Sequence, residues 1–113
     1  MRQLISLAID VPLRHPFTVL FNWDPAKNEI LKEHRQVSFE TVVVHLGRGD
    51  LWRTAEHPNQ NAYPGQRLFF VLINNYVYIV PYEIRASVFW LIAIIPSRRA
   101  TAEYQKETHH EAK

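Results

Sequence analysis

One stretch decides the fold, RLFFVLINNYVYIVPY at residues 67–82. Two runs of β-branched and aromatic side chains surround the pair Asn74-Asn75. Asn accepts a positive φ more readily than most residues, and a two-residue hairpin turn needs that conformation. The pattern therefore predicts a β-hairpin with strands over 67–73 and 76–82.

Further strands are predicted on both sides of this hairpin. Downstream, residues 88–95 (VFWLIAII) are almost entirely apolar, and we expect them to form the most buried strand, which Pro96 ends. Upstream, FTVLFNW (17–23) and LWRTAE (51–56) have the side-chain content of strands. The Pro-rich segment 57–66 predicts a loop.

Two helices are predicted after the first strand. Asp24 is a suitable N-cap and Pro25 suits the first helical position, which gives a helix over 25–34. Ser38 caps a second helix, and Gly47 would end it in the left-handed conformation. The apolar residues of this helix recur at helical spacing and predict one buried stripe: Phe39, Val42, Val43 and Leu46.

The order of elements indicates a single α+β domain. After Ser97 a short C-terminal helix is predicted over 98–105. We expect an antiparallel sheet of about four to five strands, with two N-terminal helices and this helix packed on it. The domain would cover 17–105, preceded by an appendage over 1–16 that a misassigned translation start would explain, and followed by a polar tail over 106–113.

Composition excludes several kinds of chemistry. The chain has 113 residues, no cysteine and only three glycines, so it lacks thiol chemistry and the Gly-rich loops that bind phosphates. It has six histidines but no HxxxH pattern, so we expect no metal site and no cofactor. The longest apolar run, 88–95, is too short to span a membrane, and a cytoplasmic protein without membrane contact is expected.

Two polar pairs are the first candidates for a functional site. Glu56-His57 opens the Pro-rich loop, where a carboxylate and an imidazole could transfer protons; the alternative is that His57 only holds the loop. Arg98-Arg99 begins the last helix, where the pair could clamp a phosphate; the alternative is two solvated helix residues. Catalysis by both pairs requires that they share one hollow.

Other candidates depend on aromatic and basic residues. Tyr82 stands at a strand end beside Pro81 and could stack on a base or donate a proton. The hairpin tyrosines Tyr76 and Tyr78 could stack on bases with it, but we expect alternation to place these tyrosines on both faces. At the end of the first predicted helix, His34 suits the helix dipole, and that structural role is the preferred interpretation.

Five segments in this order resemble the BrnT toxin family, over about residues 21–104. The segments are FNWDPAKN (21–28), EHRQVSFET (33–41), EHPNQNAYPGQ (56–66), INNYVYIVPY (73–82) and IIPSRRAT (94–101). The resemblance implies a fold related to the RelE-type ribonucleases and a bacterial type II toxin that cleaves RNA. It also implies neutralisation by a ribbon-helix-helix antitoxin, through which the complex would reach operator DNA.

The resemblance and the residues together give a hypothesis of metal-independent RNA cleavage. The ribose 2′-hydroxyl attacks the adjacent phosphorus, so the protein must remove one proton, offset phosphoryl charge and protonate the leaving oxygen. Glu56 or His57 would be the base and Tyr82 or His34 the acid. Arg98, with Arg67 or Arg99, would offset the charge. Lys27 and Lys32 would join Arg67, Arg98 and Arg99 in binding RNA.

Two other functions stay open on the sequence alone. One is a non-catalytic, degenerate toxin that only binds an antitoxin partner, which would not arrest growth when expressed alone. The other is an RNA-binding domain that uses the hairpin tyrosines, which would bind RNA with steep salt dependence and leave it intact.

Overall fold

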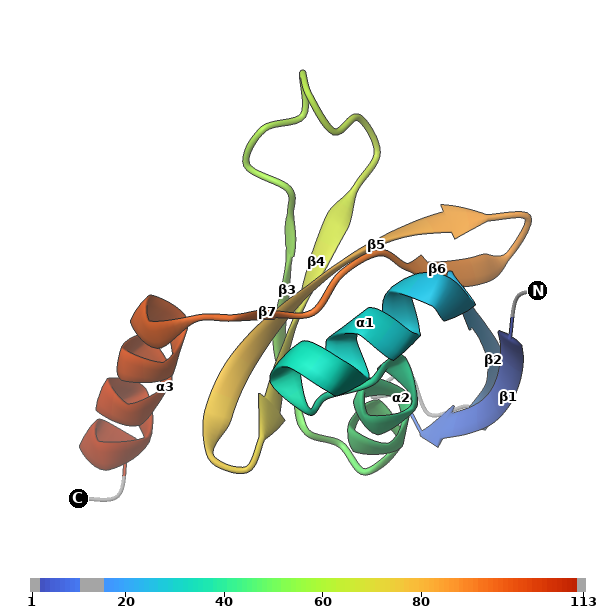
Figure 1. The fold of residues 1–113 in the computed structure, drawn as a ribbon. Helices are drawn as coiled ribbons and strands as arrows, with labels where there is room; N and C mark the ends of the chain where they lie inside the picture. The colour runs from blue at the N-terminus through green and yellow to red at the C-terminus, as the bar shows by residue number, and fades with distance from the viewer. Residues whose placement is uncertain (1–2, 11–15, 112–113) are drawn as a thin grey trace.

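The computed structural model describes residues 3–10 and 16–111, with side chains described for 19–108. The chain folds into one mixed sheet with the strand order β1-β2-β6-β5-β4-β3, and β7 pairs with β5 beyond the end of β6 (Figure 1). The strands are β1 (Gln3–Asp10), β2 (Pro16–Trp23), β3 (Leu51–Glu56), β4 (Arg67–Ile73), β5 (Tyr76–Arg85), β6 (Val88–Leu91) and β7 (Ile95–Pro96). The helices are α1 (Pro25–Arg35), α2 (Phe39–Gly47) and α3 (Arg98–Glu111).

The predicted central hairpin is confirmed. β4 pairs antiparallel with β5 from Ile73↔Tyr76 to Arg67↔Tyr82. Asn74 and Asn75 have φ values of 52° and 65°, the left-handed conformation that a tight turn matching the twist of two strands requires. The paired residues are those predicted, and β5 continues beyond the hairpin to Arg85, where it pairs with β6.

The predicted single strand over 88–95 is wrong, because the chain divides it in two. β6 pairs with β5 from Val88↔Arg85 to Leu91↔Tyr82, and β7 resumes the pairing at Ile95↔Ile79 with the register shifted by one residue. This extra residue makes a bulge that turns Ile94 into the core, where it is 1% exposed. The run is also not the most buried strand, since the first three residues of β6 are only half-buried.

The sheet is not purely antiparallel, which corrects the expected architecture. β2 runs parallel to β6, from Leu20↔Val88 to Asn22↔Trp90. A parallel pair needs a long connection, and here the two helices and the central hairpin lie between the two strands. Residues 3–10, expected to belong to an appendage, form β1 and pair along β2 from Gln3↔Trp23 to Asp10↔Pro16. The domain therefore has more strands than predicted.

The helices begin where the caps predict. Side chains of Asp24, Ser38 and Ser97 accept backbone N–H groups of Ala26 (3.0 Å), Thr41 (3.1 Å) and Ala100 (3.0 Å), respectively. The ends differ more from prediction.

Gly47 does not take the left-handed conformation; α2 ends through Arg48 and the positive φ of 88° falls at Gly49. α3 runs on to Glu111, through residues expected to form a polar tail; residues 112–113 lie outside the described part.

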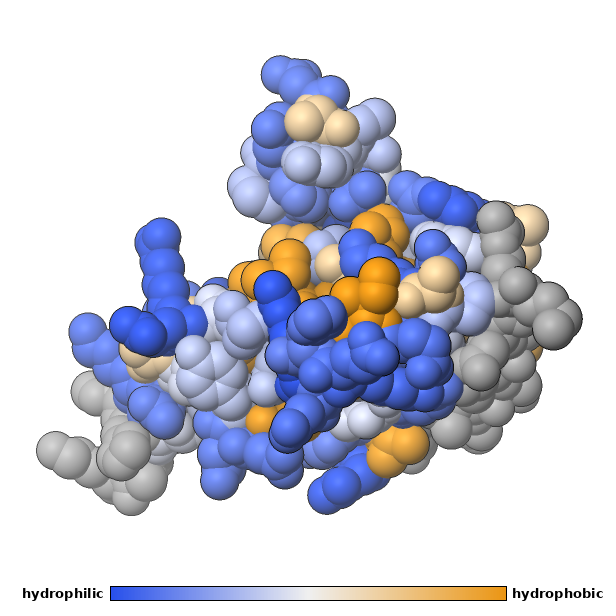
Figure 2. Space-filling view, in the orientation of Figure 1, coloured by the Kyte–Doolittle hydropathy of each residue, from blue (hydrophilic) through white to orange (hydrophobic). Residues whose placement is uncertain are grey.

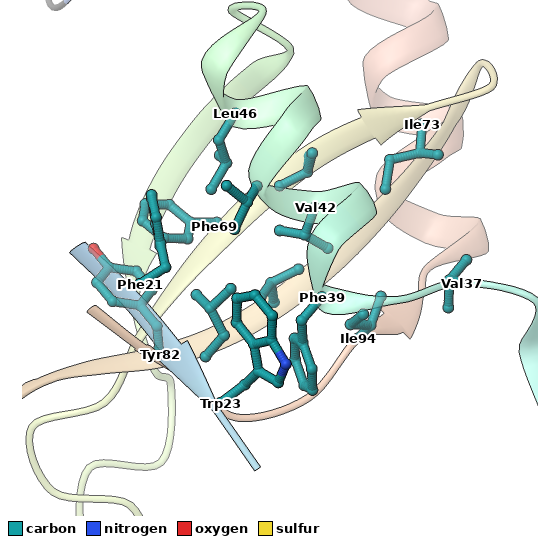
Figure 3. Close-up of a cluster of buried hydrophobic side chains, with 14 of the residues drawn as sticks. Phe21, Trp23, Val37, Phe39, Val42, Leu46, Phe69, Ile73, Tyr82 and Ile94 are labelled. Atoms are coloured by element: carbon teal, nitrogen blue, oxygen red, sulfur yellow. The ribbon is translucent and has the colours of Figure 1, made fainter. Parts of the chain in front are cut away.

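The core lies between the sheet and the layer of α1 and α2. Trp23, 0% exposed, stacks on Phe39 of α2 with ring centroids 5.7 Å apart, and the predicted stripe of α2 is buried around them (Figure 3). On the opposite face of the sheet, Tyr104 of α3 packs edge-on against Trp52, which contacts Phe70. Phe69 belongs to the core and Phe70 to this second face, as alternation along a strand requires.

A buried amide connects the two N-terminal helices. Asn28 is 1% exposed; its Nδ2 donates to Glu40 Oε1 at 2.8 Å, and its Oδ1 accepts the Phe39 backbone N–H at 2.8 Å. We expect Asn28→Ala to lower the free energy of unfolding by about 2 kcal/mol, because it leaves a buried N–H without its acceptor. Urea unfolding measures this; an unchanged midpoint would contradict the role of the amide.

Glu40 links stability to acid pH. Burial raises the pKa of its carboxyl, but the Asn28 amide, its own backbone and Lys32 outweigh burial and hold the pKa below the ordinary 4.5. A lowered pKa stabilises the fold above the unfolded value, and this contribution is lost as pH falls through the folded value.

We therefore expect Glu40→Gln to flatten the fall in stability below pH 4.5, as measured by urea unfolding at pH 7 and pH 3. The effect should be below about 1 kcal/mol, because the side chain is about one-third exposed. An unaltered pH profile would contradict it.

Candidate functional site

Three of the predicted site residues lie in one row across the sheet. Glu56 at the end of β3 is directly opposite Arg67 of β4, and Arg67 is directly opposite Tyr82 of β5. Side chains of directly paired residues project from the same face of a sheet. We name these three residues the sheet-end cluster: Glu56, Arg67 and Tyr82. His57 is opposite Gln66 in the same ladder, so alternation turns its side chain to the other face of the sheet, and the expected pairing of Glu56 with His57 in one site is wrong.

The pair Glu56 and Arg67 has the closer of the two antiparallel geometries. The backbone N–H of His57 donates to Gln66 O at 3.0 Å, so the next pair inward, Glu56 and Arg67, is the non-hydrogen-bonded one. Its β-carbons are expected about 5 Å apart. Among the described residues, neither charged group has an ion pair within 4.0 Å. A carboxylate and a guanidinium therefore stand side by side, and both can engage a ligand.

His57 is fixed by the loop that it opens. Its Nδ1 accepts the Asn59 backbone N–H at 3.0 Å, so a proton on a neutral ring sits on Nε2. The ring packs on Tyr63 with centroids 4.5 Å apart. Gln60 donates to the carbonyls of His57 (2.9 Å) and Gln66 (3.0 Å), which closes the base of the loop. The loop projects beyond the sheet (Figure 1), and the two strand residues that flank it, Glu56 and Arg67, belong to the cluster.

Tyr82 is mainly a core residue. It is 4% exposed and stacks face to face on Phe69, with centroids 3.9 Å apart, while its hydroxyl lies at the outer edge of the buried cluster (Figure 3). The expectation that the hairpin tyrosines fall on both faces is wrong. Tyr76, Tyr78 and Tyr82 are separated by even numbers of residues and share one face. The burial of Tyr82 under Phe69 nevertheless prevents a continuous stacking platform.

Arg98 and Arg99 are not part of this cluster. The residue before them, Ser97, donates its backbone N–H to Val77 O at 3.0 Å. Val77 is five residues along β5 from Tyr82, which is roughly 16 Å at the rise of a strand. α3 also packs on the other face of the sheet from Phe69 and Tyr82. The expectation that the arginine pair and Glu56-His57 share one hollow is therefore wrong, because the bulge and β7 carry the chain to the far end of β5.

The basic residues of α1 lie neither in the sheet-end cluster nor beside Tyr82 on β5. Lys27 and His34 line a groove of about 320 Å³ between α1 and residues 93–95. That segment and β3 are separated by β5 and β4, about 14 Å across the sheet, so His34 does not reach Glu56. Lys32 is on another side of α1, paired with Glu29 at 3.2 Å and Glu40 at 3.9 Å. The expected catalytic role of His34 is not supported by this placement.

Sequence reasoning missed Arg35 as a residue of the groove. Its Nη1 donates to the carbonyl of Ile94 at 3.1 Å, across 59 positions of sequence. A basic residue in the last turn of a helix is ordinarily explained by the helix dipole. The bulge that brings Ile94 to this helix left no signal in the sequence.

The described part of the chain shows two further features. In it, no group of three or more His, Cys, Asp or Glu side chains could hold a metal ion. No helix within residues 3–10 and 16–111 is long and apolar enough to cross a bilayer. Comparison of the chain with profiles of known families, with curated proteins and with solved structures found no match.

Proposed function

We propose that this protein is an RNA-cleaving toxin of the type II toxin–antitoxin kind, and that the sheet-end cluster is its catalytic site. The observation that carries this proposal is the pairing of Glu56 with Arg67 at the mouth of a rigid loop, with no ion pair between them among the described residues. The resemblance of five segments to BrnT supports the same reaction. An α+β domain with two N-terminal helices on a sheet agrees with the RelE-like fold that the resemblance implies.

The cluster contains the groups that RNA cleavage by intramolecular phosphoryl transfer requires. Glu56 removes the proton of the ribose 2′-hydroxyl, which then attacks the adjacent phosphorus. Arg67 offsets the charge that develops on the phosphoryl oxygens. The Tyr82 hydroxyl, at the outer edge of the core, is the donor to the leaving 5′-oxygen. The products are a 2′,3′-cyclic phosphate and a 5′-hydroxyl, and the reaction needs no metal.

Arg98 and Arg99 have no part in this step, because they cannot contact the same phosphodiester. The proposed protein partner is a ribbon-helix-helix antitoxin that neutralises the toxin and carries the complex to operator DNA, as the resemblance implies.

The test is cleavage of a labelled transcript by purified protein in EDTA, together with expression in bacteria without a partner. We expect cleavage and growth arrest. Binding of intact RNA with steep salt dependence would instead favour an RNA-binding domain. If the protein neither cleaves RNA nor arrests growth, the result would favour a non-catalytic interaction module.

A further inference from the structure

We propose that the groove between α1 and residues 93–95 binds an acidic, amphipathic helix of a partner protein. We name it the α1 groove, and it is separate from the sheet-end cluster. Its walls are one stripe of α1 and the segment that joins β6 to β7. This inference does not depend on the proposed catalytic function, since no residue of the cluster lines the groove.

The α1 groove exposes apolar side chains that the fold does not bury. Ile30 is 56% exposed and Ile95 is 44% exposed, and both line the same groove, as does Ala93. Figure 2 shows this hydrophobic surface above α1, bordered by hydrophilic residues. Isolated exposed isoleucines are common, but two that line one hollow offer a partner an apolar surface to bury.

The charges of the α1 groove have one sign. Lys27, His34 and Arg35 line it, and no Asp or Glu does. Lys27 has no ion pair with any described residue, whereas Lys32 on the same helix is satisfied by Glu29 and Glu40. Arg98 and Arg99, also without ion pairs among the described residues, follow closely after Ile95. Carboxylates are the complement of this surface.

The backbone of the α1 groove favours a helix over an added strand. The Ile94 carbonyl already accepts from Arg35 Nη1 at 3.1 Å, and the Ile92 N–H donates to Pro81 O at 2.8 Å. The segment therefore presents no regular ladder for an extended peptide. From Lys27 to His34 the wall rises about 10 Å, or two helical turns. A partner helix with apolar residues at i and i+4, flanked by acidic ones, matches this length.

The residues that line the α1 groove favour a protein ligand over RNA. The lining contains no Phe, Tyr or Trp side chain, and the imidazole of His34 is the one ring in it on which a base could stack. The hydrogen bond from Arg35 to Ile94 fixes one wall before binding, so little ordering is needed when a partner arrives.

The test selects peptides from a displayed library of about 14 residues, four helical turns, against the immobilised full-length chain. We expect enrichment of sequences with Asp or Glu flanking an apolar i, i+4 pair. For a selected fluorescent peptide, Ile30→Ser and Lys27→Glu should each raise Kd about tenfold or more. Matched controls are Ile84→Ser, at an isoleucine 57% exposed on β5, and Lys106→Glu on α3; each should change Kd less than about twofold.

Several outcomes would overturn the inference. They are enrichment of neutral or basic peptides, no enrichment at all, or equal weakening by the groove variants and the controls. Displacement of the peptide by single-stranded oligouridine, with Lys27→Glu abolishing RNA binding and Ile30→Ser leaving it intact, would assign the groove to RNA. Circular dichroism checks that each variant folds. If Ile30→Ser does not fold, the Kd of Lys27→Glu still tests the groove. RNA cleavage should be unchanged in Ile30→Ser, which separates this test from the catalytic one.

Discussion

Glu56→Gln is expected to lower the rate of RNA cleavage about 10² to 10⁴-fold, the usual contribution of a general base. The amide keeps the shape of the side chain and cannot accept the 2′-hydroxyl proton. Glu56 is exposed and pairs with Arg67 only through strand register, so the substitution should leave the free energy of unfolding within about 0.5 kcal/mol of wild type. Single-turnover cleavage of a labelled transcript measures the rate.

Matched variants separate this effect from a general loss of charge. Glu103→Gln removes an exposed carboxylate on α3 and should leave the rate unchanged. Arg67→Lys keeps the positive charge but loses the planar fork, so its rate should fall between wild type and Arg67→Ala. The double variant Arg98→Ala with Arg99→Ala should retain the wild-type rate of the chemical step. If that double variant loses as much activity as Glu56→Gln, the catalytic site is not the sheet-end cluster.

Trp23→Ala is expected to cause the largest loss of stability, about 3 to 5 kcal/mol. The side chain is fully buried and stacks on Phe39, so its removal leaves a cavity between β2 and α2. Its Nε1 is buried without a hydrogen-bond partner among the described residues. Trp23→Phe should therefore cost clearly less than Trp23→Ala, because no hydrogen bond is lost with the ring nitrogen.

Urea unfolding followed by circular dichroism measures both Trp23 variants. Trp52→Ala provides a control, because Trp52 is only partly buried, on the other face of the sheet. A Trp23→Ala protein as stable as Trp52→Ala would contradict the central place of Trp23 in the core. If Trp23→Ala is too unstable to purify, the midpoint of Trp23→Phe still tests the packing.

Local signals predicted most elements of the fold. Asp24, Ser38 and Ser97 each accept the backbone N–H groups that their cap positions predict. Asn74 and Asn75 tolerate the positive φ that fixes the central hairpin, and its register in turn places Arg67 opposite Tyr82. These features depend on residues close in sequence, whose conformational preferences are strong.

Non-local features escaped prediction. The second hairpin turns at Ala86 and Ser87, which have φ values of 49° and 67° although neither residue favours that conformation. The bulge before β7 and the parallel pairing of β2 with β6 depend on packing across the sheet, and no residue type marks them. The prediction of the candidate site shows the same difference between local and non-local features. Glu56 and Arg67 flank the predicted loop, whereas the position of Arg98 depended on the unpredicted bulge.

The chemical ends of the RNA products test the proposed function most directly. The purified chain, incubated in EDTA with an oligoribonucleotide and with its all-2′-deoxy counterpart, is expected to cleave only the former. Mass spectrometry should find a 2′,3′-cyclic phosphate on one product and a 5′-hydroxyl on the other, and Glu56→Gln should yield neither at the wild-type rate. Cleavage of the deoxy strand, products with a 5′-phosphate, or full activity in Glu56→Gln would contradict the proposal.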